Sequence, residues 1–397
     1  MSRAQPPLKN RLFLSLALAG IVSAPAIADD QDIHRSAYHD YRVVELVEGL
    51  ERPWSMAFLP NGDLLVTEKP GRLRLVRDGA LVEAPIEGIP AVHNVGQGGL
   101  LDVVPHPDYA ENGWIYLSYA RPLEGEESTT AVIRGRLDGM TFVDQEDIFE
   151  ARSNGRGHYG SRLVFDDDQY LFITVGDRQA RPQGDEDALK AHPAQNLELH
   201  QGVVLRLHDD GRIPDDNPFV GRDDALPETW SYGHRNPQGM IVHPETNEIW
   251  ITEHGPEGGD ELNLVKAGAN YGWPVVGYGV NYGSGTAIHG ATRMEGTEEP
   301  LKVWVPSAGT SGLAFYQGEA FKHWNGHLLS GGLAGQRVDL LELKDGEVVR
   351  EETIAQNHGR IRDVRIGPDE LVYLAVDSRE DGPSILRLEP LPRGPIN

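Results

Sequence analysis

The sequence contains no cysteine, which excludes a disulfide scaffold, a zinc–thiolate or iron–sulfur site and a cysteine nucleophile. Positive charge is scarce, because 36 lysines and arginines stand against 61 aspartates and glutamates, a formal net charge of −25. A protein that binds a polyanion along its length needs basic residues, so we expect no nucleic-acid partner. A strand–GxGxxG–helix unit is also absent, which argues against a nicotinamide cofactor. With no run of about 18 apolar residues, we expect no membrane span either.

The N-terminus has the composition of a targeting segment. Three basic residues precede an apolar run over 12–22, and small residues follow up to Ala28. This order predicts a secretory signal peptide over 1–28, cleaved near Ala28, and export to the periplasm. An uncleaved anchor is the alternative. Residues 29–397 are then expected to form a single domain.

One strand–turn–strand sequence pattern recurs along the rest of the chain. Its six copies begin at Ser55, Leu101, Arg162, Gly239, Gly312 and Asp363. Runs of β-branched and aromatic residues flanking turn residues predict β-hairpins. A third strand is expected at 72–77, 131–137, 203–207, 261–265, 338–343 and 384–388.

Six units of roughly 60 residues predict an all-β fold, a six-bladed β-propeller with four-stranded antiparallel blades around a central channel. A pair of β-sandwiches is the alternative. Propellers bind ligands with the loops around one mouth of the channel, which directs attention to the long polar loops 176–202 and 253–300.

The first candidate pair is His158 and Asp177, which flank neighbouring strands of the third repeat. Residues before one antiparallel strand and after the next emerge at the same sheet edge, so we expect the two side chains within hydrogen-bonding reach. An aspartate that accepts one imidazole N–H leaves the other nitrogen free as a general base. A loop histidine beside a turn-capping aspartate is the alternative.

Two arginine-containing segments suggest recognition of an anion. Arg235 and Asn236 lie in a turn leading into the fourth repeat, and arginine suits multidentate recognition of oxygen-rich ligands. Arg360 and Arg362 alternate on the extended chain before the sixth repeat, so both point to one face and repel each other unless an anion joins them. Pairing with acidic neighbours is the alternative for both segments.

Glycines beside acids in 252–263, and the following segment 268–274, place backbone carbonyls next to carboxylates. These are the hard oxygen ligands that calcium prefers, although the EF-hand pattern is absent. Gln97 lies among three glycines at the entrance to the second repeat, where its amide is expected either to bind a ligand or only to shape a turn.

The order of these motifs resembles the soluble quinoprotein sugar dehydrogenases, specifically the periplasmic aldose sugar dehydrogenase branch of the soluble glucose dehydrogenase family. The resemblance runs from about Pro53 to Leu388. It implies a six-bladed propeller that binds pyrroloquinoline quinone (PQQ) and calcium at the channel mouth. It also implies oxidation of an aldose at its anomeric carbon to a lactone, with hydride transfer to PQQ and then electron transfer to an external acceptor.

The resemblance assigns roles to the candidate residues. The catalytic base falls on His158, with Asp177 hydrogen-bonded behind it, and Arg235 matches the arginine that polarises the quinone. Asn236 and Gln97 match polar residues of the cofactor and substrate site.

The resemblance also assigns the charged ligands of the cofactor and the metal. Arg360 and Arg362 match the pair that faces the cofactor's carboxylates. The carbonyls of Gly255 and Pro256 match the ligands of the calcium that also binds the cofactor. Glu261 and the Tyr271 carbonyl match a second, structural calcium site.

One departure from the family stands out. The glucose dehydrogenase branch has a cofactor-binding lysine after a strand of the fifth blade, where this sequence has Ala334. Whether Arg337 replaces that lysine is left open. His254, beside the calcium loop, has no assigned role.

Two other functions fit a propeller: a calcium-dependent lactonase or other hydrolase, and a non-catalytic carbohydrate-binding protein. The three arginines exceed what a neutral lactone needs but suit a tricarboxylate such as PQQ. We therefore expect a sugar as the small-molecule partner, an electron acceptor that the sequence does not identify, and a monomer or homodimer.

Overall fold

The computed structural model describes residues 1, 33–125, 127–377 and 383–392. Apart from Met1, the predicted signal peptide lies outside these residues, and the fold belongs to the unit Ile33–Asn397. In the part of the chain that is described, no helix has the length and apolar character needed to cross a membrane.

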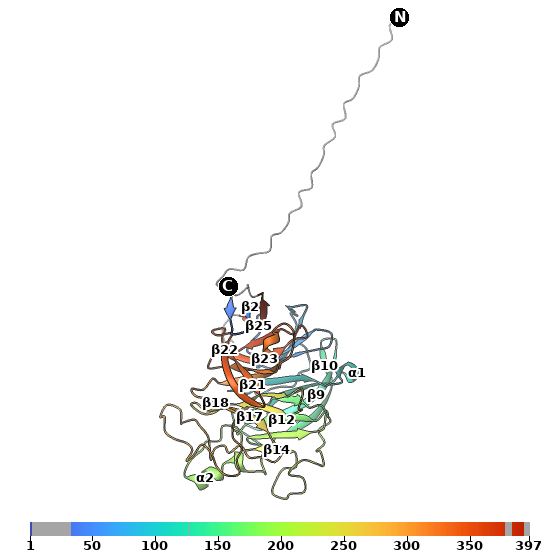
Figure 1. The fold of residues 1–397 in the computed structure, drawn as a ribbon. Coiled ribbons are helices and arrows are strands. Elements are labelled where there is room, and N and C mark those ends of the chain that lie inside the picture. The colour runs from blue at the N-terminus through green and yellow to red at the C-terminus, as the bar shows by residue number, and fades with distance from the viewer. Residues whose placement is uncertain (2–32, 126, 378–382, 393–397) are drawn as a thin grey trace. The chain divides into compact units, whose positions relative to one another are not determined.

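The described strands form six antiparallel sheets, the blades of a propeller (Figure 1). The first two blades are β3 (Pro53–Phe58), β4 (Leu64–Glu68), β5 (Arg72–Arg77), β6 (Ala80–Leu81) and β7 (Leu100–Pro105), β8 (Ile115–Pro122), β9 (Ser128–Asp138), β10 (Thr141–Glu150). The third and fourth are β11 (Leu163–Phe165), β12 (Leu171–Val175), β13 (Val203–Leu207), β14 (Thr229–Tyr232) and β15 (Pro237–Val242), β16 (Ile249–Glu253), β17 (Asp260–Val265), β18 (Lys302–Trp304).

The fifth blade is β19 (Thr310–Tyr316), β20 (His327–Gly332), β21 (Arg337–Lys344) and β22 (Glu347–Ile354). The sixth combines both ends of the chain: β23 (Ile361–Ile366), β24 (Val372–Val376), β25 (Pro383–Leu391), β2 (Asp40–Glu48) and β1 (His34–Arg35). The described helices are short: α1 (Tyr109–Asn112), α2 (Glu186–Lys190), η2 (Pro193–Gln195) and η3 (Lys322–Trp324). The six-bladed propeller predicted from the sequence is confirmed, and each expected third strand is present.

The second strand of a blade is buried on both faces. All residues of β4, β12, β16 and β24 are buried, and their sequences are nearly continuous apolar runs. A strand has such a continuous apolar sequence when neighbouring layers cover both of its faces. The largest apolar clusters accordingly lie between adjacent blades, for example between the first and second and between the fifth and sixth.

Ring closure joins residues from opposite ends of the chain. Strand β2 pairs with β25 from Asp40↔Leu391 to Glu48↔Pro383, and the two strands lie side by side in Figure 1. Tyr41 of β2 is only 2% exposed and accepts a hydrogen bond at its hydroxyl from the Ala355 amide at 2.8 Å. The sequence repeats did not predict the pairing of β2 with β25, because β2 lies outside the recurring sequence pattern.

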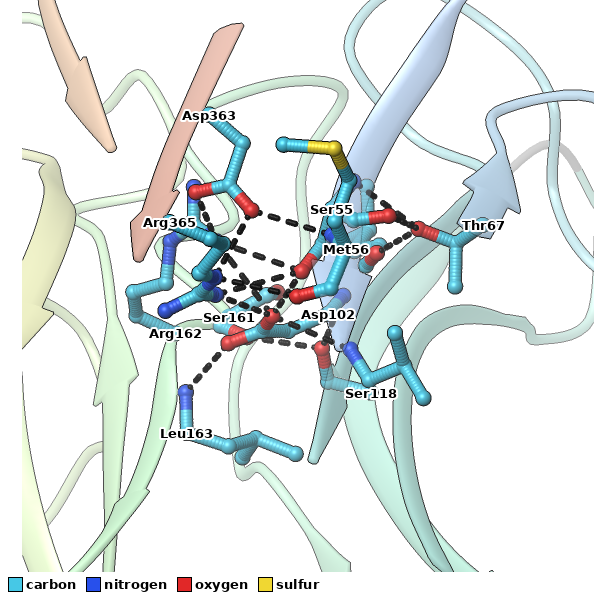
Figure 2. Close-up of polar contacts among 12 residues, drawn as sticks. Ser55, Met56, Thr67, Asp102, Ser118, Ser161, Arg162, Leu163, Asp363 and Arg365 are labelled. Carbon is cyan, nitrogen blue, oxygen red and sulfur yellow. Dashed lines mark hydrogen bonds and ion pairs between the residues drawn. The ribbon is translucent and has the colours of Figure 1, made fainter. Parts of the chain in front are cut away.

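A largely buried ion-pair network joins residues at the inner strands of several blades (Figure 2). Arg162 lies 3.3 Å from Asp102 and 3.0 Å from Asp363. Arg365 lies 3.3 Å and 3.0 Å from the same two aspartates. Two positive and two negative charges balance, which limits the cost of burying them.

Candidate functional site

A cavity of about 200 Å³ opens at the channel mouth. Its lining includes four of the residues that the sequence predicts for cofactor binding or the sites beside it: Gln97, Asn236, Arg360 and Arg362. Its other polar lining residues were not predicted for this role: Arg52, Lys69, Gln238, His254 and Asp377.

β-Bulges direct three side chains into this cavity. In β3, β15 and β23 the pairing register shifts near the start of the strand, at Trp54, Gln238 and Arg362. A bulge re-aims the residue that it leaves unpaired. All three side chains line the cavity. The irregular start of these inner strands therefore builds the site, whereas the regular hairpins build the scaffold.

Three guanidinium groups surround one carboxylate at the cavity. Asp377 Oδ1 accepts a hydrogen bond from Arg52 Nε at 2.9 Å, while Arg362 Nη2 and Arg360 Nε lie 3.5 Å and 3.7 Å from Asp377 Oδ2. Burial acts to raise the pKa of Asp377, but these arginines outweigh burial and lower the pKa to about 2. Burial lowers the pKa of Arg362 to about 10, and the charge of Asp377 offsets this only in part.

The structure brings His158 and Asp177 together, with Nδ1 and Oδ1 2.6 Å apart. His158 adopts a left-handed backbone conformation (φ 43°), and its amide donates to Gln97 Oε1 at 2.7 Å. Its Nε2 makes no hydrogen bond with the residues that the structure describes. His158 itself does not appear in the cavity lining, but its neighbours Gln97 and Tyr159 do.

Burial dominates the electrostatics of this pair. It lowers the pKa of His158, and the charge of Asp177 offsets this only in part. Burial acts to raise the pKa of Asp177, but the charge of His158 and the hydrogen bond to it outweigh burial and lower it. Trp273 Nε1 donates to Asp177 Oδ2 at 2.8 Å, a contact that holds the carboxylate from its other side.

Arg235 and Asn236 are held by different contacts. The Arg235 amide donates to Glu253 Oε2 at 2.7 Å, and its guanidinium donates to the Gly255 carbonyl at 2.6 Å and lies over the Trp273 ring. Asn236 Oδ1 accepts from the Gly160 amide at 3.2 Å, so this side chain joins the third and fourth blades.

A second, smaller cavity of about 20 Å³ brings all four predicted metal residues together. Its lining includes Glu253, Gly255, Pro256, Glu261 and Tyr271. Burial, Glu253 and Asp260 raise the pKa of Glu261 to about 8. Asn263 Nδ2 bridges Glu253 and Glu261 at 3.0 Å each. Within the described ranges, no group of three or more His, Cys, Asp or Glu side chains is arranged to hold a metal ion. Any metal here would need backbone carbonyls as ligands.

His254 lies between the two cavities and lines both. Its Nδ1 lies 3.4 Å from Asn236 Nδ2, and its buried Nε2 has no hydrogen-bond partner among the described residues. Burial lowers the pKa of His254 to about 4. The ring is therefore neutral near pH 7.

The sequence analysis did not predict Asp377 as a site residue, although its position at the end of a second strand could have indicated it. Asp377 directly follows β24, just as Asp177 comes two residues after β12 and Glu253 ends β16. All three acids lie at the mouth end of a second strand. Arg52 and Lys69 carry an equivalent signal, because they lie immediately outside β3 and β4.

The mouth of the propeller gathers three guanidinium groups around the carboxylate of Asp377, next to a buried histidine–aspartate pair, an arrangement that suits an anionic ligand. Comparison with known proteins identifies the family. The family described as Glucose / Sorbosone dehydrogenase matches residues 50–387.

Individual relatives agree with this match. The aldose sugar dehydrogenase YliI of Escherichia coli is 41% identical over 353 residues, which cover 87% of this chain and 92% of that protein. A crystal structure of a glucose dehydrogenase is 44% identical, with a TM-score of 0.81, covering 87% of this chain and 98% of its own. The PQQ-bound aldose sugar dehydrogenase of Streptomyces coelicolor is 27% identical, with a TM-score of 0.72, covering 88% of this chain and 98% of its own.

The chain therefore belongs to the glucose/sorbosone dehydrogenase family. It is a sugar dehydrogenase, an oxidoreductase, as the resemblance of its motifs indicated.

Proposed function

We propose that the protein is an exported, periplasmic quinoprotein that oxidises aldose sugars at the anomeric carbon to lactones, using PQQ and calcium. Electrons then pass to an external acceptor. The observation that carries this proposal is the arginine-lined cavity next to the His158–Asp177 pair. The PQQ-bound relative supports the cofactor, and the basic, apolar and small-residue order of the N-terminus supports export.

The charged groups of the larger cavity fit a tricarboxylate. Arg52, Arg360 and Arg362 share the one carboxylate of Asp377. Buried Arg360 Nε has no hydrogen-bond partner within the described residues. Positive charges gathered in one cavity repel one another unless an anion joins them, and guanidinium groups pair with carboxylates in bidentate fashion. Arg360 and Arg362 would hold carboxylates of PQQ, with Gln97 and Asn236 as neutral partners.

The donor set of the smaller cavity fits calcium. Its oxygen donors are the Gly255, Pro256 and Tyr271 carbonyls and the Glu261 carboxylate, the ligand type that calcium prefers. Buried Asn263 Oδ1 has no partner among the described residues, and crowded acids raise the pKa of Glu261. The Gly255 carbonyl, which accepts from Arg235, keeps a second lone pair. Calcium bound there would act as a Lewis acid beside the cofactor.

When bound, PQQ supplies the quinone that takes up the hydride from the sugar. This chain supplies the base: His158 Nε2 would accept the proton of the anomeric hydroxyl. Asp177 fixes the tautomer by accepting from Nδ1 and stabilises the imidazolium that forms. The Arg235 guanidinium, held by the His254 and Gly255 carbonyls, would contribute a fixed positive charge near the reacting atoms. Loss of a hydride and a proton converts the sugar to the lactone.

The family match favours this function over the two other functions that fit a propeller. A lactonase or a carbohydrate-binding protein is compatible with the fold, but the chain belongs to a dehydrogenase family. The oligomeric state, monomer or homodimer, remains a prediction.

Reconstitution tests the proposal. Purified protein incubated with PQQ and calcium should reduce an artificial dye when an aldose is added, and protein without PQQ should not. Analysis of the product should detect the lactone. The absence of both a bound-quinone spectrum and dye reduction would refute the assignment.

A further inference from the structure

A cavity of about 470 Å³ lies at the end of the inner strands away from the candidate site, and we call it the apolar funnel. Its lining comes from the last residues of five inner strands, β7, β11, β15, β19 and β23, and from three of the connections that follow them. In β23, Arg362 lines the cavity at the channel mouth, and Ile366 lines the apolar funnel about 13 Å further along the strand. The two cavities have no lining residue in common.

The lining of the apolar funnel offers almost no polar group to a ligand. Gln317 and Arg365 are its polar residues, and the others are aliphatic, aromatic or proline side chains. The Arg365 guanidinium is already paired with Asp102 and Asp363, at 3.3 Å and 3.0 Å (Figure 2). Much of the lining, including Phe315, is only partly buried. Apolar surface that a protein leaves open to water in this way marks a contact site.

The connections that follow the six inner strands are strongly acidic. We call them together the turn ring, which consists of 59–63, 106–114, 166–170, 243–248, 317–326 and 367–371. The turn ring contains eleven aspartates and glutamates but one lysine and no arginine. It is about a tenth of the chain, yet its formal net charge is −10 of the total of −25.

Several acids of the turn ring face water without a counter-ion. Asp63 pairs with Arg77, whereas Asp167, Asp168 and Glu245 are exposed and make no ion pair within the described ranges. Negative charges gathered around an apolar surface attract a cationic partner and repel an anionic one. A nucleic acid and a second copy of this chain, which carries the same charge of −25, are therefore disfavoured.

We propose that the apolar funnel and the turn ring form a docking surface for a basic protein. The partner would insert an apolar segment into the funnel and place lysines or arginines against the turn ring. An apolar centre with a polar rim of complementary charge is the general arrangement of protein–protein interfaces. Because the docking surface lies at the opposite end of the inner strands from the candidate site, a bound partner leaves that site open.

A labelled peptide of defined composition tests this proposal. The probe has a central segment of leucine and phenylalanine between two pairs of lysines, and fluorescence anisotropy at low ionic strength gives its dissociation constant. Added salt should weaken binding, because it screens exposed charges. One control peptide carries glutamates in place of the lysines, and a second carries serines in place of the apolar residues. Each control should bind at least roughly tenfold more weakly, because each lacks one half of the complementarity.

Charge substitutions on the protein locate the bound probe. The double variant Asp167→Lys/Asp168→Lys in the turn ring and the variant Gln317→Lys in the funnel lining should each raise the dissociation constant roughly fivefold to tenfold, because each introduces repulsion. Glu124→Lys is the matched control, since Glu124 is an exposed acid in the connection between β8 and β9, outside the turn ring. It should change the dissociation constant no more than about twofold. All the substituted side chains are exposed, and circular dichroism verifies that each variant is folded.

Three results would refute the docking surface. The first is equal binding of the lysine and glutamate peptides, and the second is a dissociation constant that is the same for the wild type and for both the turn-ring and the funnel variants. The third is equally tight binding of the serine peptide, which would show that the funnel takes no part. None of these results bears on the proposed function, because the measurement uses neither sugar nor cofactor.

Discussion

At the scale of single residues, the histidine–aspartate pair is set by contacts from three blades. Asp177 follows β12 of the third blade, Gln97 reaches the His158 amide from the loop before β7, and Trp273 reaches Asp177 from the loop after β17. The imidazole is thus oriented by groups far apart in the sequence. Burial keeps it neutral until a proton arrives.

Replacement of His158 tests its role as the base. His158→Ala should lower the turnover number roughly 10²–10⁴-fold, the usual contribution of a general base. The PQQ dissociation constant should change little, because the ring bonds Asp177 and not the arginines. Steady-state kinetics and fluorescence titration measure the two quantities. Unaltered turnover would remove His158 from the reaction.

Trp273 offers a finer test of the pair. Trp273→Phe keeps an aromatic ring but removes the donor to Asp177 Oδ2. Because a hydrogen bond to the ionised carboxylate lowers its pKa, its loss makes the pair hold a proton more tightly. The acidic limb of the pH profile of kcat/KM should move up by roughly 0.5–1 pH unit.

A tryptophan elsewhere provides the control for this measurement. Trp250 is buried in β16, and its Nε1 has no hydrogen-bond partner among the described residues. Trp250→Phe should therefore leave the pH profile in place. An identical profile for both variants would show that Trp273 acts only by packing.

At the scale of elements, hydroxyl groups on three of the second strands join neighbouring blades. Thr67 Oγ1 donates to the Leu101 carbonyl, Ser118 Oγ to the Ser161 carbonyl, and Thr252 Oγ1 to the Ser311 carbonyl. Each of these bonds ends at a carbonyl near the start of an inner strand of the neighbouring blade. The bonds thus stabilise the ring close to the channel mouth.

Thr252→Val measures how much one such hydrogen bond contributes to the free energy of unfolding. Thr252 is buried and donates to Ser311 at 3.0 Å, so the variant should lose about 1–2 kcal/mol of unfolding free energy. Urea denaturation provides the measurement. Thr246→Val, in an exposed turn, should change stability by no more than about 0.5 kcal/mol. Equal effects for the two variants would show that the inter-blade bond contributes nothing.

At the scale of the whole molecule, the ring depends on pairing between residues some 340 positions apart. Strand β2 completes the sixth blade, and Tyr41 anchors it against the core between the fifth and sixth blades. Its ring packs edge-to-face against Phe321 and Trp324. Closure buries an edge that would otherwise pair with other chains.

Tyr41→Ala should therefore weaken the whole propeller. Truncation of a buried aromatic side chain costs about 3–5 kcal/mol, and cooperative unfolding in guanidinium chloride should shift accordingly. Tyr282→Ala, which truncates an exposed tyrosine, is the control and should have little effect. Similar midpoints for the two variants would contradict the closure argument.

Much of the fold could be predicted because its signals are local. Turn residues between β-favouring runs identify hairpins such as β3–β4 and β23–β24, and their sixfold recurrence identifies the propeller. The pairing of His158 with Asp177 also followed from local reasoning, since both flank strands of one blade. The fourth strands and the closing strand β2 could not be found, because their residues lie outside the repeated pattern.

The scaffold and the chemical types at the channel mouth were readable from the amino-acid sequence alone: a histidine, several arginines, and glycines beside acids. Which cations share a cavity depends on how the chain folds. Arg52 and Lys69 enter it, whereas Arg337 turns to Asp339. The reason is physical: bulges and blade packing aim these side chains, and both depend on contacts between segments distant in the chain.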